Sequence, residues 1–293
     1  QAHDVIDMIK KYGIVPEEVY TGLQYGRDFH IHAEMVDALQ GILDAVNKNP
    51  NRQITPVWTK GFMRYIEAYL GDTPETFTYE GKEYTPQSFA ASLDLNLNDY
   101  VELTSYQIYP FYEEVELTIP DNWMHARYYN LPIDELMEVM NNALKNGYSV
   151  CWDGDVSHNG FSHPDGLAIL PTNNPEEMIN AEIDKWTTLS EEDRERKMRS
   201  FESPVPEMKV DDNKRQFTFN NRQTTDDHLM HITGMLKDQN GTIYYKTKNS
   251  WGEDRNPFGG YLYMSEPFCR LQTVAIMVHK DAIPKAIRKK LGL

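Results

Sequence analysis

Two short runs frame the C-terminal part of the sequence: Asp227-His228-Leu229-Met230 and, with its Asn 21 residues beyond the His, Lys248-Asn249-Ser250-Trp251-Gly252. Between them, residues 228–236 and 242–248 are rich in Ile, Thr and Tyr, which predicts two strands. Residues 237–241, Lys-Asp-Gln-Asn-Gly, have the composition of a hairpin turn. Folding this hairpin about its loop brings His228 and Asn249 nearly opposite each other, within about two residues of register.

A His and an Asn held together in this way have a known chemical use. A thiol nucleophile needs an imidazole that takes and returns its proton, and a third group that orients the imidazole through its other nitrogen. The Asn249 carboxamide can act as that third group, and Trp251 can shield the hydrogen bond from water. We therefore interpret His228 as the general base and acid, Asn249 as its orienter and Trp251 as support. The alternative is a His and an Asn that only cap strand ends.

Metal binding has two candidate locations. His228 and His231 form a His-x-x-His pair, but on a strand an odd separation puts the two side chains on opposite faces. Residues 153–163 contain two Asp and two His with several Gly, which suits a hard or borderline cation in a loop. This run lacks the spacing of a calcium loop and a closing Glu, and a solvated surface loop explains it better than a metal site does. We predict no metal and no cofactor.

The two cysteines, Cys151 and Cys269, lack the surroundings of a nucleophile. A reactive thiol of the relevant type sits at the N-terminus of a helix, where the backbone amides and the dipole lower the thiol pKa. Cys151 instead follows Tyr148-Ser-Val, which has strand composition, and it precedes His228 by only 77 residues. Neither cysteine is therefore a convincing nucleophile for His228.

Composition sets wider bounds. The chain has 293 residues, of which 40% are hydrophobic and 12% aromatic, enough for a substantial core. Its formal net charge of −16 argues against a nucleic acid partner. No apolar run approaches the roughly 18 residues of a membrane span. No signal peptide is visible, but the first residue is Gln and not Met, so any targeting segment would already be lost.

The sequence pattern predicts helices in the N-terminal part of the chain and mainly strands in the C-terminal part. Helices are predicted over residues 2–12, 33–46, 60–70, from Thr85, and over 132–147, and strand-like segments over 100–117 and 148–152. Residues 174–209 are acidic and then mixed in charge, which predicts a charged helical insertion. We expect one incomplete domain over 1–293, mainly helical over 1–99 and β-rich over 100–293.

Several motifs in this order resemble the bleomycin hydrolase and aminopeptidase C branch of the papain-like cysteine peptidases. They are Lys11-Tyr-Gly-Ile-Val-Pro16, Thr85-Pro-Gln-Ser-Phe89, Pro132-Ile-Asp134, His228, and Asn249-Ser-Trp-Gly-Glu253. The resemblance implies an α+β papain-like fold, with a helix-rich lobe incomplete at its N-terminus and a β-barrel-like lobe. In the family the nucleophilic Cys precedes the first of these motifs. It would therefore lie on a missing N-terminal segment, and this chain alone is expected to be inactive.

The resemblance also implies a function. The protein would be a cysteine-type aminopeptidase that releases N-terminal residues from peptides, a cytoplasmic homohexamer whose C-terminal carboxylate, here that of Leu293, restricts the cleft. Asp227 and Leu229 flank the catalytic His and would contact the peptide substrate. A periplasmic or secreted location stays open because the true N-terminus is not in this sequence. The alternative function is a non-catalytic binding or scaffold protein that retains the fold.

Overall fold

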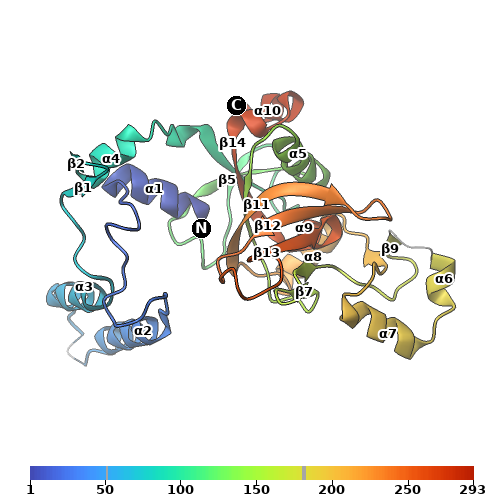
Figure 1. The fold of residues 1–293 in the computed structure, drawn as a ribbon, viewed down its shortest axis with the longest axis horizontal. Helices are drawn as coiled ribbons and strands as arrows, with labels where there is room; N and C mark the ends of the chain where they lie inside the picture. The colour runs from blue at the N-terminus through green and yellow to red at the C-terminus, as the bar shows by residue number, and fades with distance from the viewer. Residues whose placement is uncertain (51, 180–182) are drawn as a thin grey trace. The chain divides into compact units, whose positions relative to one another are not determined.

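A computed structural model describes residues 1–50, 52–179 and 183–293 (Figure 1). The chain divides into two compact units, one of residues Gln1–Ile6 with Asn96–Leu293 and one of residues Asp7–Leu95. Helix α1 (Ala2–Tyr12) begins in the first unit and ends in the second. Helices dominate the front of the chain and strands its back, and the prediction of a single incomplete domain stays a prediction.

The larger unit contains a ten-stranded mixed sheet with the strand order β4-β5-β3-β14-β6-β11-β12-β13-β8-β7. Strands β11, β12 and β13 of this sheet lie side by side in Figure 1. In chain order its strands are β3 (Tyr100–Thr104), β4 (Glu114–Glu116), β5 (Arg127–Asn130), β6 (Val150–Gly154), β7 (Phe161–Ser162), β8 (Leu167–Ala168), β11 (His228–Lys237), β12 (Ile243–Lys248), β13 (Tyr261–Ser265) and β14 (Thr273–His279). The central position of β6 is important, because it pairs with both β11 and β14. Segments distant in sequence therefore meet beside the start of β11.

Helix α5 (Ile133–Lys145) supplies much of the core of this unit. It carries acidic residues in its first turn and Lys145 in its last, which suits the helix dipole. Its buried side chains, from Ile133 to Ala143, join one cluster with Trp152 of β6 and Ile232 of β11. Burial of such apolar side chains contributes roughly 1.5–3 kcal/mol each.

The other helices of this unit are shorter. They are α6 (Ile183–Thr187), α7 (Glu191–Ser200), α8 (Asp212–Asn220), α9 (Glu266–Gln272), α10 (Lys285–Leu291) and the 3-10 turns η1 (Leu97–Asp99) and η2 (Lys280–Ala282). Strands β9 (Met178–Ile179) and β10 (Glu207–Met208) form a separate antiparallel pair. The predicted charged insertion over 174–209 contains the charged helix α7, while its residues 180–182 lie outside the described residues. No helix in the described ranges has the length and apolarity to cross a membrane.

The predicted hairpin is present as β11 and β12, with a register that differs from the symmetric one. His231 pairs with Lys248, and the pairing shifts at a bulge between Ile232 and Gly234. The pairing is therefore displaced by two residues from that of a hairpin folded symmetrically at the centre of its loop. The start of β11 consequently extends past β12, and His228 pairs instead with Gly154 of β6.

The smaller unit contains α2 (Ala33–Asn47) packed against α3 (Val57–Leu70), the hairpin β1 (Phe77–Tyr79) and β2 (Lys82–Tyr84), and α4 (Pro86–Ser92). Thr85 caps α4 by accepting a hydrogen bond from the Ser88 backbone N–H, as the sequence predicts. Gly13 follows α1 with φ of +81°, the left-handed geometry expected of a glycine that ends a helix.

Candidate active site

His228 and Asn249 meet in the structure as the hairpin predicts. His228 Nε2 lies 2.8 Å from Asn249 Oδ1. A carboxamide oxygen only accepts, so the imidazole donates from Nε2 and carries its proton there in the neutral form. Within the described residues Nδ1 has no hydrogen-bond partner, and the half-buried ring leaves this atom available as a base.

Asn249 is itself held by two further contacts. Its Oδ1 accepts a hydrogen bond of 2.7 Å from the Ser250 backbone N–H, and its Nδ2 donates to Nδ1 of His163 at 3.3 Å. Only 2% of Asn249 is exposed. Burial lowers the pKa of His163, with Arg255 and His228 acting in the same direction. This keeps the His163 ring neutral and able to accept from the carboxamide.

Trp251 covers these groups. Its ring centroid lies 5.2 Å from that of His228 and 5.1 Å from that of His163. Phe161 contacts the same indole edge-on at 5.9 Å. The indole remains 43% exposed, so it separates the two imidazoles from solvent on its own side. This is the placement expected of a side chain that shields the His228 to Asn249 hydrogen bond.

The loop after Asn249 is fixed by a close backbone approach. The Asn249 N–H donates to the Gly260 carbonyl at 3.0 Å. Gly260 has φ of +77°, and a Cβ at this position would lie 2.8 Å from the Gly252 carbonyl oxygen. Only glycine satisfies both conditions, so Gly260 holds the Asn-Ser-Trp-Gly turn against β13.

Strand β6 and the loop that follows it position His228 from the other side. Gly154 lies between His228 of β11 and Thr273 of β14. Asp155 links the loop to the residues that precede His228, since its Oδ2 accepts from the Thr225 N–H at 2.7 Å. Asp227 Oδ1 accepts from the Val156 N–H at 3.0 Å. The segment that leads into β11 is therefore fixed to the loop after β6 by hydrogen bonds to the carboxylates of Asp155 and Asp227.

An open pocket of about 340 Å³ adjoins His228. The predicted site residues Asp227 and Leu229 line it together with His228. Asp153 and Trp123 also line it, and no motif in the sequence pointed to Trp123. The pocket is large enough for the end of a peptide beside the imidazole.

Leu293 is the one predicted site residue that the structure does not bring to this group. It follows α10, where its N–H donates to the Arg288 carbonyl, and it does not line the described pocket beside His228. Strand β14 begins level with Gly154 and His228 and ends at His279, before η2 and α10. The chain thus leaves the level of His228 before it reaches Leu293.

Neither cysteine can serve His228. Cys151 pairs with His231 on β11, three residues or about 10 Å along the strand from the level of His228. Burial, then the charge of Asp153, raises the pKa of Cys151 to about 12. Cys269 is fully buried in α9, and burial raises its pKa well above the usual value. Both therefore stay protonated and inert near neutral pH.

The run from Asp153 to His163 has protein partners and shows no metal-binding arrangement. His158 accepts from the Gly160 N–H at 2.9 Å, and His163 contacts Asn249. Among the described residues no three His, Cys, Asp or Glu side chains are placed to hold a metal ion. Sequence reasoning grouped His163 with a loop cation and missed its place behind Asn249, which depends on the pairing of β7, β8 and β13.

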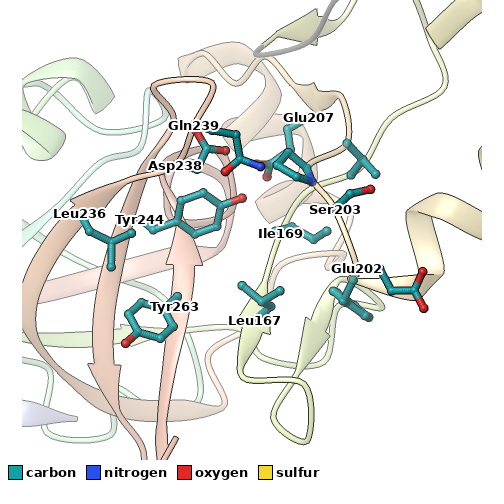
Figure 2. Close-up of a pocket in the computed structure, with 13 residues that line it drawn as sticks. Leu167, Ile169, Glu202, Ser203, Glu207, Leu236, Asp238, Gln239, Tyr244 and Tyr263 are labelled. Carbon is teal, nitrogen blue, oxygen red and sulfur yellow. The ribbon is translucent and has the colours of Figure 1, made fainter.

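A second pocket, of about 290 Å³, lies between the edge of β12 and β13 and the segment 201–207 (Figure 2). Leu167, Ile169, Tyr244 and Tyr263 make its lining mainly apolar. The buried Glu207 in its wall accepts hydrogen bonds from the Leu170 N–H and the Ser265 hydroxyl, which gives it a structural role. None of the predicted site residues lines this second pocket.

An α+β fold with a His and an Asn joined under a Trp defines a class, the papain-like peptidases. The sequence pattern of the peptidase C1-like family matches residues 1–201 and 199–292. The chain belongs to this family, in its bleomycin hydrolase and aminopeptidase C branch.

Relatives at low identity support the assignment. The chain is 22% identical to aminopeptidase G of Lactobacillus delbrueckii subsp. lactis, with 97% of this chain and 63% of that protein covered. It is 25% identical to aminopeptidase C of Streptococcus thermophilus, with 94% and 61% covered. The crystal structure of PepW from Lactobacillus rhamnosis matches 97% of this chain and 63% of its own length with a TM-score of 0.61 at 18% identity. The chain thus spans somewhat more than three fifths of these proteins.

Proposed function

We propose that this chain supplies the His and Asn of a cysteine-type aminopeptidase, and that the nucleophilic Cys lies on an N-terminal segment outside these 293 residues. The observation that carries the proposal is the 2.8 Å hydrogen bond from His228 Nε2 to Asn249 Oδ1, which leaves Nδ1 unpartnered within the described residues, next to a pocket. The names of the relatives, aminopeptidases G and C, support the substrate class.

The chemistry follows from this geometry. His228 Nδ1 takes the proton of the Cys thiol, and the thiolate attacks the carbonyl carbon of the peptide bond nearest the substrate's N-terminus. The C–N bond breaks as His228 returns the proton to the leaving amine, which leaves a thioester. Water then attacks the thioester carbonyl while His228 takes a proton from it. The C–S bond breaks, the N-terminal amino acid leaves as the free acid, and His228 returns the proton to the thiolate.

Asn249 acts throughout as a positioning residue. The hydrogen bond that it accepts from Nε2 fixes the plane of the imidazole and directs Nδ1 toward the thiol. Ser250 and His163 fix the carboxamide in turn, so the ring orientation is set before substrate arrives. Trp251 keeps water from competing for Nε2.

The test uses the protein extended at its amino end by the Cys-bearing segment. Hydrolysis of leucine 7-amido-4-methylcoumarin is measured for the unaltered protein, His228→Ala and His231→Ala. His231 is a matched control, because it lies three residues along the same strand and is exposed. We expect His228→Ala to abolish turnover and His231→Ala to retain it.

Two outcomes contradict the proposal. Equal activity of the His228→Ala variant removes His228 from the mechanism. An extended protein that folds but turns over no aminoacyl or blocked peptide substrate favours the alternative, a binding or scaffold protein that keeps the fold. The absence of a reactive Cys near His228 in the described residues is the observation behind that alternative.

A further inference from the structure

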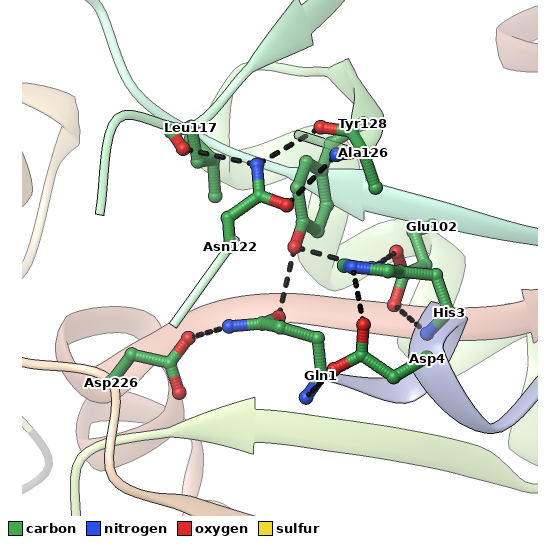
Figure 3. Close-up of polar contacts among 9 residues, drawn as sticks. All are labelled: Gln1, His3, Asp4, Glu102, Leu117, Asn122, Ala126, Tyr128 and Asp226. Carbon is green, nitrogen blue, oxygen red and sulfur yellow. Dashed lines mark hydrogen bonds and ion pairs between the residues drawn. The ribbon is translucent and has the colours of Figure 1, made fainter. Parts of the chain in front are cut away.

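Asn249 differs from the other two buried asparagines of the described residues in the group that holds its carboxamide nitrogen. Nδ2 of Asn122 donates to two backbone carbonyls, as Figure 3 shows, and Nδ2 of Asn130 donates to three. Nδ2 of Asn249 donates instead to Nδ1 of His163. A backbone carbonyl accepts at every pH, whereas an imidazole nitrogen accepts only while it carries no proton.

The orientation of the Asn249 carboxamide follows from its neighbours. The Ser250 backbone N–H can only donate and lies 2.7 Å from Oδ1, so the oxygen must face Ser250. The nitrogen then faces His163 at 3.3 Å and needs an acceptor there. His163 supplies that acceptor only as a neutral ring with its hydrogen on Nε2.

His163 is held so that its ring stays beside Asn249. Its backbone carbonyl accepts from the Gly166 N–H at 3.1 Å and from Nδ2 of Asn256 at 3.2 Å. The residue is buried, and the indole of Trp251 lies against its ring at an interplanar angle of 71°. Nε2 is also buried and has no hydrogen-bond partner among the described residues. The hydrogen bond from Asn249 is therefore the one polar contact of this ring within the described part of the chain.

The charged groups around His163 also favour its neutral form. Burial lowers the pKa of His163, and Arg255 in the loop after β12 and His228 on β11 act in the same direction. On its own loop, Asp165 accepts from the Ser162 hydroxyl, and no carboxylate of the described residues hydrogen bonds to either nitrogen of the His163 ring. A protonated ring would therefore be buried without a counter-ion, and its Nδ1–H would meet a second donor, the carboxamide NH2.

We propose that His163 is a proton-sensitive positioning residue, which holds the Asn249 carboxamide while its ring is neutral and releases it when the ring takes up a proton from solvent. A carboxamide that turns to accept from the protonated ring brings its nitrogen toward Nε2 of His228, which is also a donor. The hydrogen bond that orients His228 is then lost, and turnover falls. This inference rests on the proposed function and deepens it, because it names a second histidine that regulates the same site.

The test uses the 293-residue chain and so needs no nucleophile. The side-chain NH2 of Asn249 and the ring nitrogens of His163 are followed by NMR from about pH 8 to about pH 4, on both sides of the usual histidine pKa. We expect the NH2 signals to shift, and their exchange with water to quicken, in one step at the pH at which His163 takes up its proton. NH2 signals that stay unchanged while His163 titrates overturn the proposal, and so does a His163 ring that stays neutral over the whole range.

Variants of His163 locate the effect. His163→Asn offers a carboxamide oxygen in place of Nδ1, an acceptor that takes up no proton in this range, so the Asn249 NH2 signals should lose their acid step. His163→Leu removes the acceptor, so these signals should exchange rapidly with water at every pH.

His158→Asn is the matched control, because His158 is a half-buried histidine of the same loop whose Nδ1 accepts from the Gly160 N–H and not from Asn249. This variant should keep the acid step of the Asn249 NH2 signals. A step that persists in His163→Asn, or one that disappears in His158→Asn, overturns the assignment to His163.

Asn249→Ala tests the same coupling from the other side. The variant removes the donor that favours the neutral ring, so His163 should take up its proton at a higher pH than in the unaltered chain. An unchanged His163 titration would mean that the two side chains are not coupled, and it would overturn the proposal.

Activity of the extended protein separates this inference from the proposed function. At the pH at which half of His163 is protonated, the unaltered protein should lose about twofold more of its neutral kcat/KM than His163→Asn loses of its own. An inactive extended protein, in a chain whose NH2 signals follow His163, would refute the function and leave the coupling of His163 to Asn249. An active extended protein whose relative activity falls equally with and without His163→Asn would refute only the role of His163.

Discussion

Replacement of Asn249 by Ala perturbs the site at its most connected side chain. Asn249 makes three hydrogen bonds, to His228, to the Ser250 N–H and to His163, and it is buried. At about 1 kcal/mol net for each, the variant loses about 3 kcal/mol of unfolding free energy. This is a large fraction of the 5–15 kcal/mol typical of a domain, so urea denaturation resolves it.

The same variant frees the imidazole of His228. Without the carboxamide, Nε2 no longer has a fixed acceptor and the ring can rotate, which we expect to lower kcat/KM of the extended protein about a hundredfold. Ring nitrogen NMR checks the cause directly, because the Nε2-protonated tautomer should dominate in the unaltered chain and lose its dominance in Asn249→Ala. Asn249→Asp keeps an acceptor for Nε2, loses the donation to His163 and adds a buried negative charge beside the imidazole, so the neutral ring should still carry its proton on Nε2.

The control for Asn249→Ala is a variant at an exposed asparagine. Asn98→Ala removes an exposed asparagine side chain of η1 and should change stability by less than about 0.5 kcal/mol. If Asn249→Ala is as stable as the unaltered chain and keeps the Nε2 tautomer, the carboxamide does not orient His228.

Three further outcomes follow from the structure. The folded state keeps a proton on Asp153 up to about pH 9, whereas the unfolded state releases it near pH 4, so the free energy of unfolding falls as pH rises between these values. The urea midpoint should therefore decrease less from pH 6 to 8.5 in Asp153→Asn than in the unaltered chain. Equal decreases would contradict the raised pKa of Asp153. The fully buried Arg215 donates to the carbonyls of Ser105, Leu271 and Thr273, so Arg215→Ala should lower the free energy of unfolding by about 3 kcal/mol or more, and a loss below 1 kcal/mol in urea denaturation would refute this. Removal of residues 291–293 from the extended protein should leave the ratio of blocked to free peptide cleavage unchanged, whereas a rise in blocked peptide cleavage would restore Leu293 to the site.

The local sequence pattern predicted the part of the site that lies on a single hairpin. The composition of β11, its turn and β12 brings His228 and Asn249 together, and a displacement of two residues in register did not prevent the hydrogen bond. Helix α5 and the cap of α4 were predicted for the same reason, because their signals lie within one segment. Cys151 was correctly assigned to a strand.

Contacts between distant segments could not be read from the sequence. Asp153 reaches the pocket because β6 pairs with β11, and His163 reaches Asn249 because the β7 to β8 segment lies beside β13. Residues 153–163 look like a loop that could hold a cation because they combine Asp, His and Gly, whereas folding gives Asp155, His158 and His163 separate protein partners. The position of Leu293 depends likewise on where β14 ends.

We propose that His228 and Asn249 serve a thiol that lies outside these 293 residues. The most direct measurement is hydrolysis of leucine 7-amido-4-methylcoumarin by the purified 293-residue chain and by its Cys151→Ala variant, beside the extended protein. We expect no turnover by either form of the chain and turnover by the extended protein. Turnover by the 293-residue chain that disappears in Cys151→Ala would contradict it.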